Sequence, residues 1–397
     1  MIRYYLLYLI LFTGLGAYNT FLPVYLENTL NLETSQIGVI LSIPSIIGIL
    51  FVPMWGMLSD VLKKRKGVLW FNILMTFIMT FVYIYSKSFF TVFIVAAFFE
   101  AFRNAILPLS DSLTTTYCKD NNKNYGDIRV IGSIFFAISA FLCGLLVDFT
   151  NKDVTFFYVF AMSLGLLLFL VPTLNSSKSN NEKSNDTSKT EEKINLKRDL
   201  PLLLKNKSYL LVILCGLCLN SLTEAIMSYQ GIHLINLGAS ANLVGLLTTV
   251  MVIPELFLMV KTKPLVEKYG LINMLRVGSL ALLIRWVLYF TTSNPFVFIL
   301  ATSMHGVSIS IIIICAYDLI SKIVDAKLFT TAMTVYTFIV GISYSFLKLV
   351  YGNVIQAYGI KPVFIFSIMV SLFSFVIFNK LKKMNLDSYN SVEIKIS

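Results

Sequence analysis

The chain has 397 residues, of which 57% are hydrophobic and 13% are charged, and its mean hydropathy is +0.78. Soluble globular domains carry about 25% charged residues, so this composition excludes an ordinary water-soluble enzyme. The net charge of +11 would suit nucleic acid only on a folded basic face. The sequence offers no such face, and we exclude nucleic acid as a partner.

Apolar runs long enough to cross a bilayer, which takes ~20 residues of helix, recur along the whole sequence. The first run has neither a short apolar region nor an A-x-A cleavage site, so we interpret it as a span and not as a signal peptide. We predict an all-α polytopic membrane protein with twelve transmembrane helices, at residues 4–26, 37–59, 68–86, 89–117, 126–148, 153–174, 207–231, 243–261, 271–292, 295–320, 328–351 and 360–381.

Basic residues predict the orientation of these spans. With a cytoplasmic N-terminus, the inside segments hold 24 Lys and Arg residues and the outside loops hold three. This asymmetry follows the positive-inside rule. We therefore expect a multi-pass protein of the plasma membrane, surrounded by lipid, with both termini in the cytoplasm, and we expect a monomer.

A polar segment of low complexity separates spans six and seven. It cannot bury enough apolar surface to fold, so we predict a flexible cytoplasmic linker at 175–206. Residues 56–69 and 144–157 find weak echoes six spans later, at 261–275 and 352–366, as duplicated halves would. The predicted organisation is a six-helix bundle at 1–174, the linker, a second six-helix bundle at 207–384 and a cytoplasmic tail at 385–397.

The sequence gives no reason to expect a metal or another cofactor. Cys215 and Cys218 form a C-x-x-C pair, but they lie in an apolar helix and no second pair follows at zinc-like spacing. We interpret both as small packing residues. No P-loop motif occurs, so direct ATP hydrolysis is unsupported.

Charged residues inside the fourth and fifth spans are the first candidates for a site. Glu100, Arg103 and Asp111 share one helix face at 100° per residue. Asp111 and Arg129 are equally far from residue 120, so an antiparallel hairpin places them at similar depth. An arginine fork can bind a carboxylate or vicinal hydroxyls. These two residues therefore form either a binding pair or a simple ion pair between helices.

The second half repeats this arrangement. Arg285 and His305 are equally far from Pro295, so spans nine and ten carry them at matching depth. Glu255 on span eight lies near the same level, and Glu224 lies within span seven. Charges inside a membrane protein usually face a cavity and find partners. The convergence of Glu255, Arg285 and His305 therefore favours a functional site.

The segment GMLSDVLKKRK (56–66) is similar to the signature of the major facilitator superfamily between helices two and three. In that signature Gly56 lets helices approach, Asp60 accepts bonds from a neighbouring helix end, and Arg65 and Lys66 belong to a cytoplasmic basic run. The resemblance implies the twelve-helix major facilitator fold, with two six-helix halves around a polar cavity. It also implies a gating role for these four residues.

A narrower resemblance follows from several short motifs taken together. They resemble the lactose permease and its relatives, which include oligosaccharide:proton symporters, phenylpropionate-type permeases and nucleoside permeases. The motifs are GAYNTFLPVYL (16–26), YGDIRVIGS (125–133), PELFLM (254–259), MHG (304–306) and GNVIQAYG (352–359).

The resemblance implies roles for particular residues. The substrate-binding positions are Asp111, Arg129, Phe136, Glu255, Arg285 and His305, with Phe136 standing where the permease has a sugar-stacking Trp. The family's proton carboxylate, three residues after the histidine, is replaced here by Ser308, which cannot titrate. Another carboxylate must then carry the proton. The proton-coupling candidates are Glu255, Glu224 and His305, and Asp111 is a further carboxylate to consider.

We therefore predict a secondary active transporter that works by alternating access. Its expected activity is proton-coupled uptake of a small polar or aromatic solute, such as a sugar, a nucleoside or an aromatic acid. Efflux of drugs or metabolites by proton antiport is the alternative. A membrane enzyme or receptor is a third hypothesis, but no nucleophile, base and orienting group share one level, so we predict that the protein is not an enzyme.

Overall fold

The computed structural model describes residues 1–174, 201, 203, 205–324 and 328–383. Nearly all of the predicted linker and all of the predicted tail lie outside these residues. Within them, twelve helices are long and apolar enough to cross a membrane, and no strand occurs. The prediction of an all-α protein with twelve spans is confirmed.

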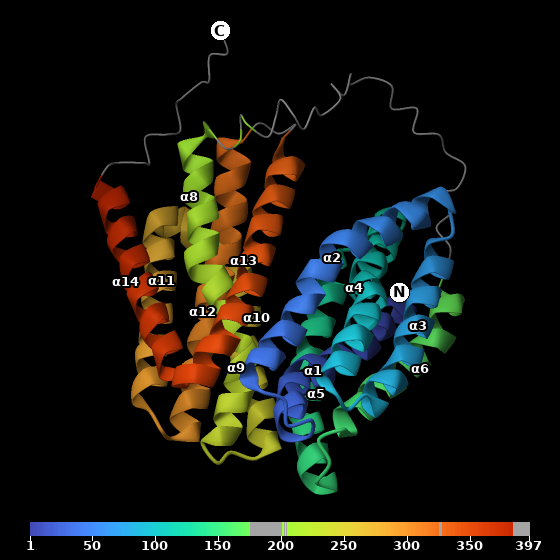
Figure 1. Cartoon of the computed structure of the whole chain (residues 1–397). Helices are drawn as coiled ribbons and strands as arrows, with labels where there is room; N and C mark the ends of the chain where they lie inside the picture. Colours follow the sequence, from blue (N-terminus) through green and yellow to red (C-terminus); the bar gives the residue numbers. More distant parts are fainter. Residues whose placement is uncertain (175–200, 202, 204, 325–327, 384–397) are drawn as a thin grey trace.

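The first six spans form one bundle, which is the N-terminal half (Figure 1). Its helices are α1 (Ile2–Asn28), α2 (Thr34–Val61), α3 (Arg65–Tyr85), α4 (Phe89–Asp120), α5 (Tyr125–Thr150) and α6 (Thr155–Leu170), followed by the short 3₁₀ turn η1 (Val171–Thr173).

The last six spans form the C-terminal half. The first of these, the seventh span of the chain, consists of two α-helices joined by a π-helical segment. The elements are α8 (Lys207–Cys215), η2 (Gly216–Ser221), α9 (Leu222–Asn236), α10 (Ala241–Tyr269), α11 (Leu271–Thr291), α12 (Pro295–Ile323), α13 (Phe329–Tyr358) and α14 (Lys361–Lys383).

Helices form here because a bilayer offers no partner for an unpaired backbone group, and an α-helix bonds its groups internally. At some exposed helix starts, the side chain of a preceding residue accepts a hydrogen bond from a backbone N–H group of the first turn. Ser88 accepts from the Thr91 amide ahead of α4, and Asn124 accepts from the Gly126 amide ahead of α5. Such caps satisfy donors that the helix itself leaves free.

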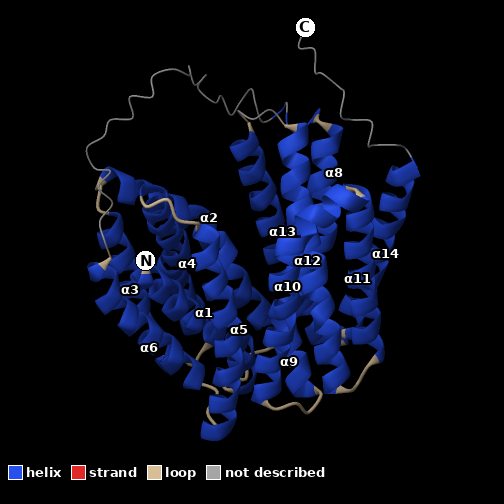
Figure 2. Ribbon diagram, turned by 180° about the vertical axis from the view of Figure 1, so that it is seen from behind, coloured by secondary structure: helices blue, strands red, loops and turns tan. Residues whose placement is uncertain are grey.

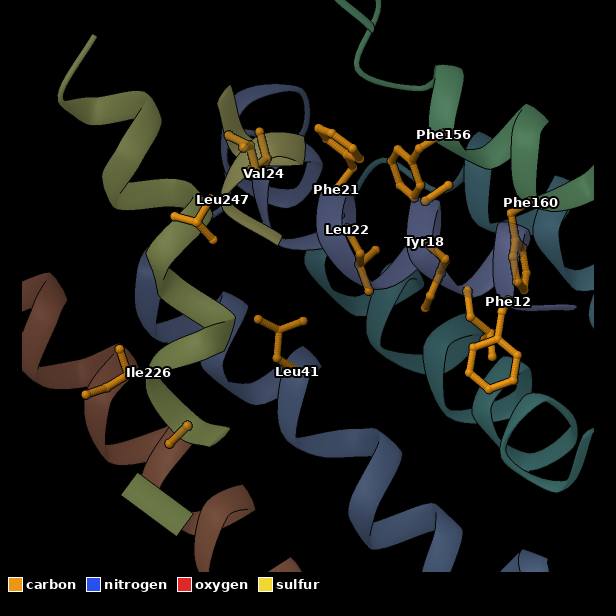
Figure 3. Packing of buried hydrophobic residues seen from close by; sticks show 14 of the residues in the cluster. Phe12, Tyr18, Phe21, Leu22, Val24, Leu41, Phe156, Phe160, Ile226 and Leu247 are labelled. Atoms are coloured by element: carbon orange, nitrogen blue, oxygen red, sulfur yellow. The ribbon is translucent and has the colours of Figure 1, made fainter. Parts of the chain in front are cut away.

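Helix α1 lies at the centre of the molecule. Of its most apolar stretch, 72% is buried, compared with 22% for α13. Tyr18 on α1 packs against Phe160 of α6 with ring centroids 5.0 Å apart. Figure 3 shows this aromatic layer on one side of α1 and residues of the C-terminal half, Ile226 and Leu247, on the other. One apolar core therefore joins the two halves through α1.

The two halves contact each other mainly through α5 with α10 and α2 with α13, and also through α1 with α9 and α10. We call the side where η1 ends and α8 begins the linker side, and the opposite one the far side. Figures 1 and 2 show that the bundles converge toward the far side and diverge toward the linker side. The interior charges therefore lie between two bundles that are joined at one side only.

Candidate functional site

A buried arginine lies in the C-terminal half, where α9, α11 and α12 meet. Arg285 is fully buried, and its Nη1 lies 3.3 Å from Nδ1 of His305. Because a guanidinium only donates, this histidine nitrogen accepts and the imidazole carries its proton on Nε2. Arg285 Nη2 donates to Gln230 Oε1 at 3.0 Å and to the Tyr289 hydroxyl at 3.2 Å. The structure thus brings Arg285 and His305 together, as their hairpin geometry predicts.

Glu255 does not complete this group in the way the sequence predicts. Its carboxylate makes no hydrogen bond or ion pair with any described residue, and its charge interacts with those of Glu224 and Arg129. At this position it is the Glu255 backbone that bonds to α12: its carbonyl accepts from the Ser310 hydroxyl at 3.1 Å. The expected side-chain convergence with Arg285 is wrong for this conformation. The half-buried carboxylate instead interacts through its charge with Arg129 of the N-terminal half.

Arg129 on α5 is an interior cation of the N-terminal half, and no described carboxylate pairs with it. Its Cζ lies 4.4 Å above the ring of Phe12, and its buried Nη1 has no hydrogen-bond partner. Among the described residues, none forms an ion pair with it. Phe136 lies seven residues further along the same helix, which is two turns and hence nearly the same face. The guanidinium is therefore held on an aromatic ring and left with a free donor.

Asp111 on α4 has two tyrosine partners. Its Oδ1 accepts a hydrogen bond from the Tyr8 hydroxyl, and a second one from the Tyr125 hydroxyl at 2.9 Å. No contact joins it to Arg129 within the described part of the chain. The alternative of a simple ion pair between α4 and α5 is therefore wrong for this conformation.

A small cavity of about 60 Å³ lies between the halves beside these groups. It is lined by residues of α1, α5, α9 and α10, namely Asn19, Thr20, Phe136, Met227, Gln230, Gly231, Val244, Leu247, Thr248 and Met251. Thr20 and Thr248 face each other across the halves with their hydroxyl oxygens 3.3 Å apart. Helices of both halves thus share one partly polar lining.

Four neutral polar residues of the cavity lining are missing from the residues that the sequence singles out. They are Asn19, Thr20, Gln230 and Thr248, and Gln230 also binds Arg285. A neutral amide or hydroxyl inside an apolar span resembles ordinary packing, whereas a charge does not. The available signal is the polar pair Asn19–Thr20 within an otherwise apolar first span.

A further group of charges lies where α2, α4, α9 and α13 approach one another. Arg103 donates from Nε to both Glu100 carboxylate oxygens at 2.9 Å, so this pair is internally neutralised. Lys348 on α13 donates across the halves to the Leu41 carbonyl at 3.2 Å. Glu224 forms no contact of its own with a described side chain, but its charge interacts with that of Lys348.

Ser308 occupies the position of the family's proton carboxylate. It is fully buried, and its hydroxyl donates to the Met304 and His305 carbonyls at 2.7 and 3.1 Å. A hydroxyl that bonds its own helix in this way fills space and carries no charge. Within the described residues, no group of three or more His, Cys, Asp or Glu could hold a metal ion.

The signature loop lies at the linker side, away from the central charges. Arg65 donates to Asp60 at 3.0 Å, and Lys66 donates to the Leu174 carbonyl at 2.8 Å. A Cβ on Gly56 would meet nothing within 4 Å. The expectation that Gly56 permits a close helix contact is therefore wrong for this conformation, because the halves diverge on that side.

Two bundles that meet at one side only, with unpaired charges between them, define a membrane transport protein. Residues 1–366 match the MFS_1 like family. The chain belongs to this family of the major facilitator superfamily, and it is a secondary transporter.

Individual relatives agree with this assignment. The chain is 31% identical over 329 residues to the uncharacterized transporter YwbF of Bacillus subtilis, covering 83% of this chain and 80% of the relative. It is 25% identical over 362 residues to a maltose permease of Geobacillus stearothermophilus, covering 91% and 89%. Identity to a lactose permease of Citrobacter freundii is 27% over 172 residues, covering 42% and 40%. The predicted resemblance to the lactose permease branch is confirmed.

A solved structure shares the fold. The nucleoside transporter NupG superposes with a TM-score of 0.82 at 17% sequence identity, covering 96% of this chain and 98% of that one. At this identity the similarity establishes the twelve-helix arrangement and nothing about the solute.

Proposed function

We propose that this transporter takes up a neutral, hydroxyl-rich solute of the sugar class together with protons. The observation that carries the proposal is Arg129, whose buried Nη1 lacks a partner. An unsatisfied charged donor in a low-dielectric interior is costly, so a ligand that accepts from it gains binding energy. The planar fork of an arginine matches two neighbouring hydroxyls. The ring of Phe136, which lines the cavity, offers an apolar face for a sugar ring.

The charge balance of the interior favours an uncharged solute. The interior charges described above comprise four cations and four carboxylates. The cations are Arg103, Arg129, Arg285 and Lys348, and the carboxylates are Glu100, Asp111, Glu224 and Glu255. An anionic aromatic acid would add an uncompensated charge to this balanced set, at a large desolvation cost.

The names of two relatives support the same solute class, since one is a maltose permease and another a lactose permease. Neither name favours the efflux alternative. Uptake by symport therefore remains the better hypothesis, and nucleosides and aromatic acids are the solutes to test against sugars.

For proton coupling we propose Glu255 as the carrier. It forms no ion pair with any described residue, and its charge interacts with that of Arg129. A solute bound to Arg129 would compete with this carboxylate, which couples solute binding to the protonation state. Glu224 is the second candidate, whereas the Asp111 carboxylate is already engaged by two tyrosine hydroxyls.

The proposed orientation puts the linker side in the cytoplasm of the cell, because the Lys and Arg residues gather in the segments of that side. The bundles diverge there, so this conformation would exchange its solute with the cytoplasm. Rocking of the halves about the central site would open the far side in turn.

A ligand-stabilisation screen tests the solute class. Purified protein is heated with disaccharides, nucleosides or small aromatic acids, each over a range of concentrations. We expect a disaccharide to raise the unfolding temperature, because a ligand at 100 times its Kd stabilises by about 2.7 kcal/mol. Stabilisation by nucleosides or aromatic acids alone would overturn the proposed class.

A further inference from the structure

The far side of the molecule contains a helix cap that comes from the opposite half. Asp148, near the end of α5, accepts from the Ala241 amide through Oδ1 and from the Asn242 amide through Oδ2, each at 2.9 Å. These are the first two residues of α10. The residue that precedes them, Ser240, makes no side-chain cap bond of its own. The N-terminal half therefore supplies the cap that α10 lacks.

The other helix pair has the same arrangement in the reverse sense. Gln356, near the end of α13, accepts from the Thr34 amide at 2.8 Å. Thr34 is the first residue of α2. Here the C-terminal half caps a helix of the N-terminal half, so the two caps run in opposite directions across the same interface.

A glycine precedes each capping residue by four positions and lets the helices meet. A Cβ on Gly144 would lie 2.7 Å from the Ala241 carbonyl oxygen, and a Cβ on Gly352 would lie 2.7 Å from the Thr34 carbonyl oxygen. Neither position has room for a side chain while the helices are in contact. The sequence thus repeats Gly-x-x-x-Asp at 144–148 and Gly-x-x-x-Gln at 352–356, six spans apart.

We propose that these two motifs are paired latches that hold the halves together on the far side, and that Asp148 and Gln356 are gating residues. The first amides of a helix have no partner within it, and a carboxylate there also meets the positive end of the helix dipole. Separation of the halves breaks each latch and returns its amides to water. The charged latch on α10 is the stronger of the two. The inference rests on alternating access but on neither the solute nor the proton carrier.

Hydrogen–deuterium exchange of the full chain in lipid nanodiscs tests this proposal. We compare Asp148→Ala and Gln356→Ala with the unaltered protein, without solute and without a gradient. Loss of a cap to Ala changes an opening equilibrium by about 2- to 30-fold. We expect Asp148→Ala to raise exchange by such a factor in the first turn of α10 and, because the halves separate together, in the first turn of α2. Gln356→Ala should raise exchange in the same two segments, but by a smaller factor.

Two matched controls lie on the same side of the molecule. Asp153 accepts from the Thr29 hydroxyl at 3.0 Å within its own half, and Asn353 bonds the Leu349 carbonyl within its own helix. Asp153→Ala and Asn353→Ala should leave both segments unchanged. If Asp148→Ala raises exchange in α10 alone, the residue is a local cap and the latch proposal is wrong. No change in either segment would also overturn it. Since no solute is present, either result is independent of the proposed sugar uptake.

Discussion

Arg129 is the residue on which the proposed binding site depends most. Its guanidinium is held over Phe12 and keeps a free donor at Nη1. Arg103 is neutralised by Glu100. Arg285 also has an unpaired Nε, but its Nη2 is bound by neutral acceptors. A lysine in its place would retain the charge but lose the planar fork. A lysine variant therefore separates the contribution of the charge to solute binding from that of the planar guanidinium.

We predict that Arg129→Lys weakens solute binding roughly 10- to 150-fold, the cost of about 1.5–3 kcal/mol for a lost hydrogen bond to a charged group. Titration of the purified variant with the stabilising disaccharide measures this loss. Arg276→Lys is the control, because Arg276 bonds Asn273 within α11, outside the site. Normal binding by the Arg129 variant would mean that this residue is structural.

Glu255 provides the second test at the scale of single residues. We predict that Glu255→Gln abolishes accumulation of solute against a gradient, because an amide cannot release a proton. Exchange of preloaded solute should survive if the residue only carries the proton, and should fail if it also binds solute. Uptake into proteoliposomes with and without a pH gradient measures both.

Glu267→Gln is the matched control for this experiment, since Glu267 is exposed on the same helix. If Glu255→Gln still concentrates solute in response to a pH gradient, the carrier lies elsewhere and Glu224 is the next candidate.

How far the site could be predicted also differs from residue to residue. Arg285 and His305 are equally far along the sequence from Pro295, and this was sufficient to predict their contact. Two residues equally far from the turn of a helical hairpin lie at the same depth in the membrane. The same reasoning put Asp111 beside Arg129, but Tyr8 and Tyr125 bind Asp111 instead. A hairpin does not reveal which side chain of a third helix, here α1, reaches the same carboxylate.

At the scale of helices, the signature loop after α2 and the latches at the far side occupy opposite ends of the same interface. Among the described residues, the Asp60 side chain bonds Arg65 alone in this conformation, and both side chains are exposed. Such a pair contributes about 0–1 kcal/mol to stability. A role for Asp60 must therefore come from the other conformation, in which the linker side closes.

We predict that Asp60→Asn slows transport about 2- to 5-fold, the equivalent of the ~0.3–1 kcal/mol that a charge gains at a helix end. Protein level, unfolding temperature and solute affinity should stay close to normal. Asp120→Asn is the control, since Asp120 is an exposed carboxylate at the end of α4. A variant that merely fails to fold would contradict a gating role.

The helices themselves were the most predictable feature, because ~20 apolar residues in a bilayer must form a helix. The echo between 144–157 and 352–366 also indicated duplicated halves. Their contacts across the interface could not be predicted in this way. The caps of Asp148 and Gln356 depend on which helices of the two halves meet, and that is a property of the assembled bundle.

At the scale of the whole molecule, the halves are joined on the far side and separated on the linker side around one set of interior charges. A transporter of this kind needs a driving ion to concentrate its solute. Because Ser308 stands in place of the family's carboxylate, proton coupling requires another carrier, and Glu255 is the one we propose.

Solute accumulation in proteoliposomes under an imposed pH gradient tests the central claim most directly. A labelled disaccharide is supplied outside at a pH about two units below the inside. For one proton per solute, the gradient can drive accumulation up to roughly 100-fold, since each pH unit is worth about 1.36 kcal/mol. We predict transient accumulation well above the outside concentration that disappears when a protonophore dissipates the gradient. Uptake that stops at the outside concentration, with or without the gradient, would contradict proton symport.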